Sequence, residues 1–398
     1  MREHPVAVAV TDDLRRSRLT VFFRFLLAVP HVVWLVLWTI VVWIVWVVAW
    51  IVTLVLGRLP AGLHRFFAAY VTYRAHLTAY LTFAADPFPG FAGGSGYPVD
   101  VAIAPPVRQN RWKTLFRPVL SIPTLSFWFV SWTVAILGWF VGLFLGRIGR
   151  GLRDLGVLGV GYRARVRSYV FFLTDRFPTP DPEVILESLG PPPEHPVRLV
   201  GPRDDLRLSR VTVFFRLALL IPHLVWLYLW GLLVWIAALV QWLGTLIMGR
   251  PIGVLHRFIS RFVRQLVHVN EFGFLVANPF PGFTGAPGSY PLDVELPPPS
   301  RQSRLKTLFR LLLAYPALAV SGALNGLLFV DAVLTWFAAL AIGRAPLGMR
   351  NLSAYAVRYL AQLYAYIFFL TDAYPNSSPL EGAAPADVLA VAALDPAA

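Results

Sequence analysis

Four long apolar runs constrain this chain more than any other feature of its sequence. Each has 28 to 32 residues, and they cover Phe25–Leu56, Pro118–Leu145, Leu217–Met248 and Leu311–Ile342. About 20 apolar residues are enough for a helix to cross the hydrocarbon core of a bilayer. The runs therefore predict an all-α, polytopic membrane protein, a multi-pass protein of the cell membrane.

The composition agrees with this prediction. Of the 398 residues, 57% are hydrophobic and 14% charged, and the formal net charge is +14, whereas soluble domains carry about 25% charged residues. Because the arginines alternate with the apolar runs, we expect them to meet anionic lipids rather than nucleic acid. The chain has no cysteine, and we expect no metal or cofactor. No short apolar stretch ends in a cleavage site at the N-terminus, so we expect no removed leader.

Each run begins with one copy of a motif and ends at Gly-Arg. The motif reads RLTVFFRFLLAVPH (18–31), RWKTLFRPVLSIPT (111–124), RVTVFFRLALLIPH (210–223) and RLKTLFRLLLAYPA (304–317). A stretch rich in Arg and Tyr follows each Gly-Arg and ends in ADPFPGF, TDRFPTP, ANPFPGF or TDAYPNS. A pattern that recurs at a fixed period is the signature of a repeat protein. The chain is therefore predicted to contain four copies of one unit.

We expect repeat units at 1–92, 93–190, 191–284 and 285–380, followed by a C-terminal tail at 381–398. Units one and three share Pro-His and an FPGF ending, while units two and four share KTLFR and FFLTD. This pattern indicates that a two-unit ancestor was duplicated once. The two halves are expected to meet in the Pro-rich stretch Gly190–Pro193.

The combination of motifs resembles the DUF4389 family of membrane proteins. The features that carry the resemblance are the YPV-type segment, the SR-to-PH motif, the long apolar run, Gly-Arg and the TD-[RA]-[FY]-P ending. They recur in four units and cover most of the chain, although units two and four replace the motif histidine with Thr124 and Ala317. The family has no assigned function, so the resemblance implies a fold and a location but no activity.

Two arrangements of each unit are compatible with the sequence. The run forms either a helical hairpin or a long single span, and an interfacial amphipathic helix follows it. Basic residues flank both ends of every run, and the positive-inside rule then favours cytoplasmic flanks at both ends and an even number of crossings. We therefore prefer four hairpins, for which Gly322–Gly326 offers a bend in unit four. The motif prolines Pro30, Pro123, Pro222 and Pro316 are expected to kink or start helices.

Short strands are predicted between the units. The segments at 5–10, 97–104, 196–200 and 290–296 alternate apolar and polar residues, as strands do. If all four lie on the cytoplasmic side, they can pair into one small sheet.

Eight arginines recur at fixed places in the repeats and are the predicted contacts to lipid headgroups. Guanidinium groups match phosphate with two parallel donors. The competing interpretation is that they anchor the topology and pair with the Asp of the TD motif. They are the second arginines of the motif, Arg24, Arg117, Arg216 and Arg310, and the Gly-Arg arginines, Arg58, Arg147, Arg250 and Arg344.

Five other polar residues interrupt the apolar runs. Polar groups inside a membrane are functional candidates by default, although a structural contact is the simpler explanation for His31, His223 and Asp331. Two histidines without a repeated carboxylate make a poor metal site. The five residues are His31, His223, Asp331, Asn325 and Gln241.

These features favour a membrane-embedded scaffold or accessory subunit that binds lipid or other membrane proteins. The alternative is a channel or transporter with a path along the pseudo-symmetry axis of the repeats. No catalytic motif of a known class is present, so we do not expect an enzyme.

Overall fold

The computed structural model describes residues 4–120, 127–201 and 207–382 of the chain. The chain is mostly helical and divides into two compact units. The first half comprises Met1–Pro192 with Ser378–Leu380, and the second comprises Pro193–Ser377 with Glu381–Ala398. The division falls in the Pro-rich stretch that the sequence indicates. Pro123, Thr124 and most of the predicted tail lie outside the described residues.

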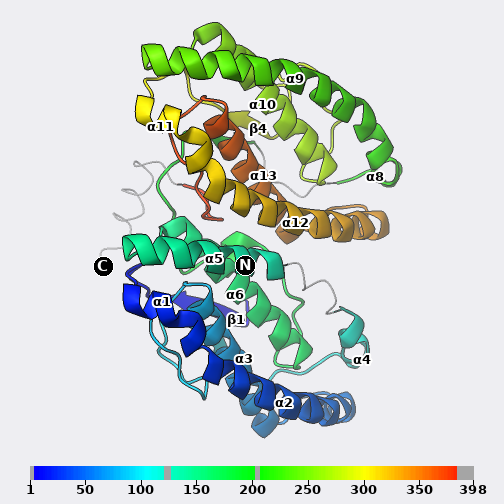
Figure 1. Ribbon diagram of the computed structural model, residues 1–398. Helices are drawn as coiled ribbons and strands as arrows, with labels where there is room; N and C mark the ends of the chain where they lie inside the picture. Colours follow the sequence, from blue (N-terminus) through cyan, green and yellow to red (C-terminus); the bar gives the residue numbers. More distant parts are fainter. Residues whose placement is uncertain (1–3, 121–126, 202–206, 383–398) are drawn as a thin grey trace, which may run out of the picture. The chain divides into compact units, whose positions relative to one another are not determined.

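The two halves have the same order of elements apart from the short helix α7, which occurs only in the first (Figure 1). The first half contains β1 (Val6–Val10), α1 (Arg18–Leu27), α2 (Val29–Leu56), α3 (Ala61–Leu81), β2 (Val99–Ile103), α4 (Arg111–Leu120), α5 (Phe127–Leu145), α6 (Arg150–Val170) and α7 (Pro182–Ile185). The second half contains β3 (Arg198–Val200), α8 (Arg210–Phe214), α9 (Arg216–Met248), α10 (Gly253–Gly273), β4 (Asp293–Glu295), α11 (Arg304–Leu308), α12 (Arg310–Ile342) and α13 (Leu347–Ile367).

Three of the four apolar runs form helices without a turn back, so the prediction of hairpins is wrong for units one, three and four, while residues 121–126 of the second run lie outside the described residues. α9 and α12 each have 33 residues without a turn and are drawn as unbroken curved ribbons in Figure 1. The predicted bend at Gly322–Gly326 stays helical within α12. A turn there would leave backbone N–H and C=O groups without partners in apolar surroundings, whereas a helix satisfies them within itself.

The motif prolines do not break these helices. Pro30 lies at the start of α2, and Pro222 and Pro316 lie inside α9 and α12. The helix is interrupted before the proline, at Ala28, Phe215 and Phe309. Among the residues that the structure describes, three helical stretches are long and apolar enough to cross a membrane, namely Arg18–Leu56, Arg216–Met248 and Arg310–Ile342.

The Arg- and Tyr-rich helices, which the sequence predicts to be interfacial, form the core of each half. α3 packs against α6, and α10 packs against α13. Most of their side chains are buried, including Tyr70 and Tyr73 on α3. Their polar groups find partners inside the protein, as when Arg165 donates to the backbone oxygens of Val6 and Val184. Burial of such groups is tolerated because they are hydrogen-bonded.

The predicted strands form two separate ribbons and not one four-stranded sheet. β1 pairs with β2 in antiparallel register, with Val8 opposite Val101. β3 pairs with β4 in the same way, with Leu199 opposite Val294. Each ribbon belongs to one half, because the strand before the first repeat of a half pairs with the strand before the second. The pair of repeats is therefore the folding unit.

Candidate functional site

The second arginine of the motif is buried and makes the same set of contacts in all four repeats. We call these sets the buried arginine contacts. Each guanidinium donates to the last carbonyl groups of the core helix of its own repeat, at Tyr80, Tyr169, Phe272 and Tyr366. It also lies 4.3 to 4.6 Å from the aromatic ring of that same residue. A cation at a helix C-terminus is favoured by the helix dipole, and the ring adds a cation–π contact.

The segment that ends each repeat adds one more partner to the buried arginine contacts. Arg24, Arg117 and Arg310 form ion pairs with Asp86, Asp175 and Asp372. In the third repeat Asn278 takes the place of the carboxylate and accepts from Arg216 over 3.0 Å. The exposed fraction of these arginines is at most 2%. The prediction that they contact lipid headgroups is therefore corrected: they hold the long helix onto its core helix, as the competing interpretation stated.

A backbone contact joins the two repeats of each half at both ends. We call α2, α5, α9 and α12, which contain the apolar runs, the long helices. Each ends at a glycine with φ between +66° and +71°, a left-handed conformation that favours glycine. These glycines are Gly57, Gly146, Gly249 and Gly343. Their carbonyl oxygens accept from the amides of Gln109, Arg16, Gln302 and Leu208, which precede the motif of the other repeat, over 2.8 to 3.0 Å. We call these four contacts the junctions.

The first arginine of each motif strengthens its junction. It donates to a carbonyl in the last turn of the other repeat's long helix, in the pairs Arg18–Phe144, Arg111–Val55, Arg210–Ala341 and Arg304–Ile247. Tryptophans in three long helices contribute as well, because their indole N–H groups donate to backbone oxygens of the other repeat's motif. The pairs are Trp50–Thr114, Trp242–Thr307 and Trp336–Val213. The start of one long helix thus lies at the end of the other, and the two run antiparallel.

The Gly-Arg arginines are exposed at the junctions and face further arginines. Backbone bridges pair Arg15 with Arg147, Arg58 with Arg108, and Arg207 with Arg344. At the fourth junction Arg250 and Arg301 occupy the same places and are also exposed. Like charges opposite each other repel, so each junction concentrates positive charge at the end of an apolar helix. The sequence did not single out Arg15, Arg108, Arg207 and Arg301.

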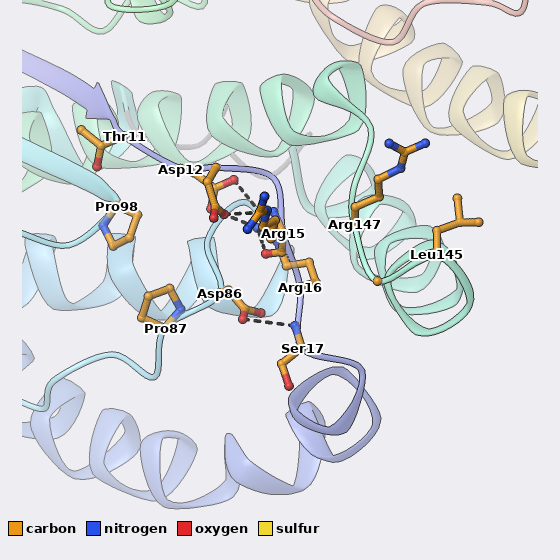
Figure 2. Close-up of a pocket in the computed structure, with 12 residues that line it drawn as sticks. Thr11, Asp12, Arg15, Arg16, Ser17, Asp86, Pro87, Pro98, Leu145 and Arg147 are labelled. Atoms are coloured by element: carbon orange, nitrogen blue, oxygen red, sulfur yellow. Dashed lines mark hydrogen bonds and ion pairs between the residues drawn. The ribbon is translucent and has the colours of Figure 1, made fainter.

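Figure 2 shows the junction of Arg15 and Arg147, where an open pocket of about 830 Å³ lies. Asp12 pairs there with the buried Arg16 over 2.8 Å, and Asp86 accepts from the amide of Ser17. The Arg147 side chain extends away from the Asp12–Arg16 pair (Figure 2). The two carboxylates thus neutralise buried arginines, and the exposed guanidinium groups are left facing outward. Such a pocket can bind an anion.

The repeats match one known family along most of the chain. The profile of a domain of unknown function (DUF4389) matches residues 18–92, 111–181, 210–284 and 304–378. The chain belongs to the DUF4389 family. Each DUF4389 match begins at the first arginine of a motif, and the four strands lie outside the matches. No curated protein and no solved structure matches this DUF4389 chain.

His31 and His223 lie under the FPGF segments of the first and third DUF4389 repeats. His31 stacks on Phe91 at 4.2 Å between ring centres, and its Nδ1 lies 2.9 Å from the Tyr73 hydroxyl. His223 stacks on Phe283 at 4.3 Å. Both rings are fully buried. This contact explains why Pro-His and FPGF occur together in the sequence.

The other polar residues of the apolar runs point to different places. Asp331 is buried and accepts from the Ser353 hydroxyl over 2.8 Å. Gln241 is buried and accepts from the amide of Ile252 over 3.1 Å. Asn325 is exposed on the outer face of α12. Each buried group thus binds the segment that follows its own long helix.

The sequence did not single out two pairs in which a buried histidine of a core helix contacts a half-buried aspartate of a strand. His76 contacts Asp100 over 3.0 Å, and His268 contacts Asp293 over 2.8 Å. Burial raises the pKa of each carboxyl, but hydrogen bonds from backbone amides and from the histidine lower the pKa overall. Near the second pair, Glu271 is fully buried and neither carboxyl oxygen has a hydrogen-bond partner in the described chain. Burial, and then the charge of Asp293, raise the pKa of Glu271 well above its ordinary value.

Metal binding finds no support in the described part of the chain, where no group of three or more His, Asp or Glu side chains is arranged to hold an ion. The features that repeat are instead the junctions and the buried arginine contacts.

Proposed function

We propose that this protein is a membrane-embedded scaffold without a catalytic role, which packs against lipid or other membrane-protein subunits. The outer faces of the long helices carry this proposal. Ile44, Trp235 and Phe337, each more than 60% exposed, are examples from three different helices. Such continuous apolar surface is favourable in lipid and costly in water.

We further propose that each long helix crosses the cell membrane once. A helix of 33 residues is about 50 Å long, which exceeds the hydrocarbon thickness of about 30 Å. The two ends of one helix then lie on opposite faces of the bilayer, together with their junctions. This topology replaces the prediction that all basic flanks are cytoplasmic. It also places the exposed Gly-Arg arginines at the ends of the apolar helices, at the depth of anionic headgroups.

The contacts of the polar residues favour the scaffold over the channel. A path along the pseudo-symmetry axis needs polar groups that share a cavity, whereas Asp331 and Gln241 bind their own following segments and Asn325 is exposed. These contacts rigidify the helix pairs.

Reconstitution of the full chain into liposomes tests this proposal. We expect the protein to resist alkaline extraction from the bilayer and to leave ion flux at the level of protein-free liposomes. The variant Asp331→Asn serves as a control, since it changes the carboxylate that a conducting path would use. Ion flux that depends on the protein and is abolished by Asp331→Asn would establish the channel instead.

A further inference from the structure

Three arginines gather on the core helices of the first half. Arg74 lies on α3, and Arg163 and Arg167 lie one helical turn apart on α6. α3 and α6 pack against each other. Arg74 and Arg163 occupy equivalent positions of the first and second repeats, each six residues before the aromatic residue that receives the buried arginine, Tyr80 or Tyr169. Burial lowers the pKa of Arg163, and the side chain of Arg74 is close enough for its charge to lower that pKa further.

This cluster points away from the strands. His76 on α3 contacts Asp100 of β2, and Arg165 on α6 contacts Val6 of β1. Arg74, Arg163 and Arg167 are each two positions from these residues, which is about 200° around a helix. They lie on the opposite side of the core layer, where Tyr70 contacts Thr39 of α2 over 2.7 Å.

The cluster has few partners and none of opposite charge in the described chain. Arg74 donates to the Tyr70 hydroxyl over 3.0 Å, and Arg163 donates to the backbone oxygen of Phe127 over 2.8 Å. All three side chains are half-buried. Burial, and then the charges of Arg74 and Arg163, lower the pKa of Arg167. Three half-buried guanidinium groups that repel one another are unfavourable unless an anion joins them.

The second half of the same chain lacks this cluster. The equivalent positions are Leu266 on α10, and Leu360 and Tyr364 on α13. α10 packs against α13 as α3 packs against α6, so the fold does not require arginine at these places. The arginines are therefore a property of the first half alone and need an explanation other than stability.

We propose that Arg74, Arg163 and Arg167 form a binding site for a phosphate-bearing anion. Guanidinium groups bind phosphate oxygens through pairs of parallel N–H donors, and three of them around one ligand neutralise its charge. This site is separate from the junctions and does not depend on the scaffold proposal.

Thermal unfolding of the detergent-solubilised full chain tests the site, with inorganic phosphate and short-chain phosphatidylglycerol as separate probes and phosphatidylcholine as the zwitterionic control. We expect a saturating anion to raise the midpoint of the wild type by about 5 °C. Stabilisation by phosphatidylglycerol alone identifies a lipid headgroup as the source, and stabilisation by inorganic phosphate as well identifies a soluble anion.

The matched variant transplants the residues of the second half, as Arg74→Leu, Arg163→Leu and Arg167→Tyr. We expect it to unfold at a higher temperature than the wild type without anion and to lose the response to both probes. A control, Arg65→Leu with Arg261→Leu, removes exposed arginines and should retain the response. A wild type that responds to neither probe, or a transplanted variant that still responds, would overturn the site. A transplanted variant that unfolds at a lower temperature without anion would show instead that the arginines stabilise the fold.

Discussion

The amide of Arg16 donates to the carbonyl oxygen of Gly146 over 2.9 Å. This contact joins the beginning of the first repeat to the end of the second long helix, 130 positions later in the chain. The same contact occurs at the other three junctions. Two repeats are thus locked to each other at both ends, which explains why the chain divides into two compact units although it contains four copies of the family domain.

Replacement of a junction glycine should destabilise the protein. In Gly249→Ala the backbone of the new alanine must keep φ near +70°, which costs about 1–2 kcal/mol. Gly322→Ala is the matched control, because this glycine lies in a helix and a Cβ added to it would meet no atom within 4 Å. It should stabilise the protein by about 0.5–1 kcal/mol. Thermal unfolding in detergent measures both, and equal effects would refute the role of the junction glycine.

The buried arginine contacts predict that two substitutions at Asp372 lower the free energy of unfolding by different amounts. Asp372→Ala leaves the buried Arg310 without its charged partner and should cost about 3 kcal/mol. Asp372→Asn should cost clearly less, because Asn278 already fills this place in the third repeat and binds Arg216. The comparison of the free energies of unfolding checks this order. An equal loss of free energy of unfolding in both variants would mean that the charge of Asp372, and not the hydrogen bond, stabilises the buried arginine contacts.

Glu271 predicts a dependence of stability on pH. The pKa of its carboxyl is raised in the folded protein, so above about pH 4.5, the unfolded pKa, the unfolded chain releases a proton that the folded chain keeps. Stability then falls as the pH rises, by about 1.4 kcal/mol per unit until the folded pKa is reached. Unfolding of the wild type and of Glu271→Gln between pH 5 and 8 tests this. The variant should lack this part of the slope, and identical slopes would contradict the prediction.

The contact between Asp331 and Ser353 predicts non-additive mutations. Ser353→Ala leaves the buried Asp331 carboxyl without the hydroxyl that donates a hydrogen bond to it and should cost about 1–3 kcal/mol. The double variant Asp331→Leu with Ser353→Ala removes both polar groups and should restore most of that loss. Free energies of unfolding of the wild type, of Ser353→Ala, of Asp331→Leu and of the double variant measure the coupling. If the double variant is less stable than the single one, Asp331 has other partners.

The repeats and the strands could be predicted because they depend on local patterns. Gly249 followed by Arg250 marks the end of a helix in the sequence, and its left-handed φ confirms that ending. The partner of Gly249, Gln302, could not be predicted, since no local pattern identifies a contact over this distance.

The hairpin prediction failed for a related reason. It treated the arginines at both ends of a run as signals of orientation. Arg216 is instead buried against the following core helix, and Arg304 caps the end of the other repeat's long helix. The sequence contains a signal for the cluster on α3 and α6, because Arg74 and Arg163 are equivalent to each other and are leucines in the second half. That signal becomes visible only when the core helices are aligned.

Labelling of single cysteines at the two ends of α9 tests most directly the claim that each long helix crosses the membrane once between two junctions. The chain has no native cysteine, and Arg207 and Arg250 are exposed before and after this helix. In intact cells, a membrane-impermeant maleimide should react with only one of Arg207→Cys and Arg250→Cys, and with the other only after permeabilisation. Reaction of both variants from the same side would contradict the account.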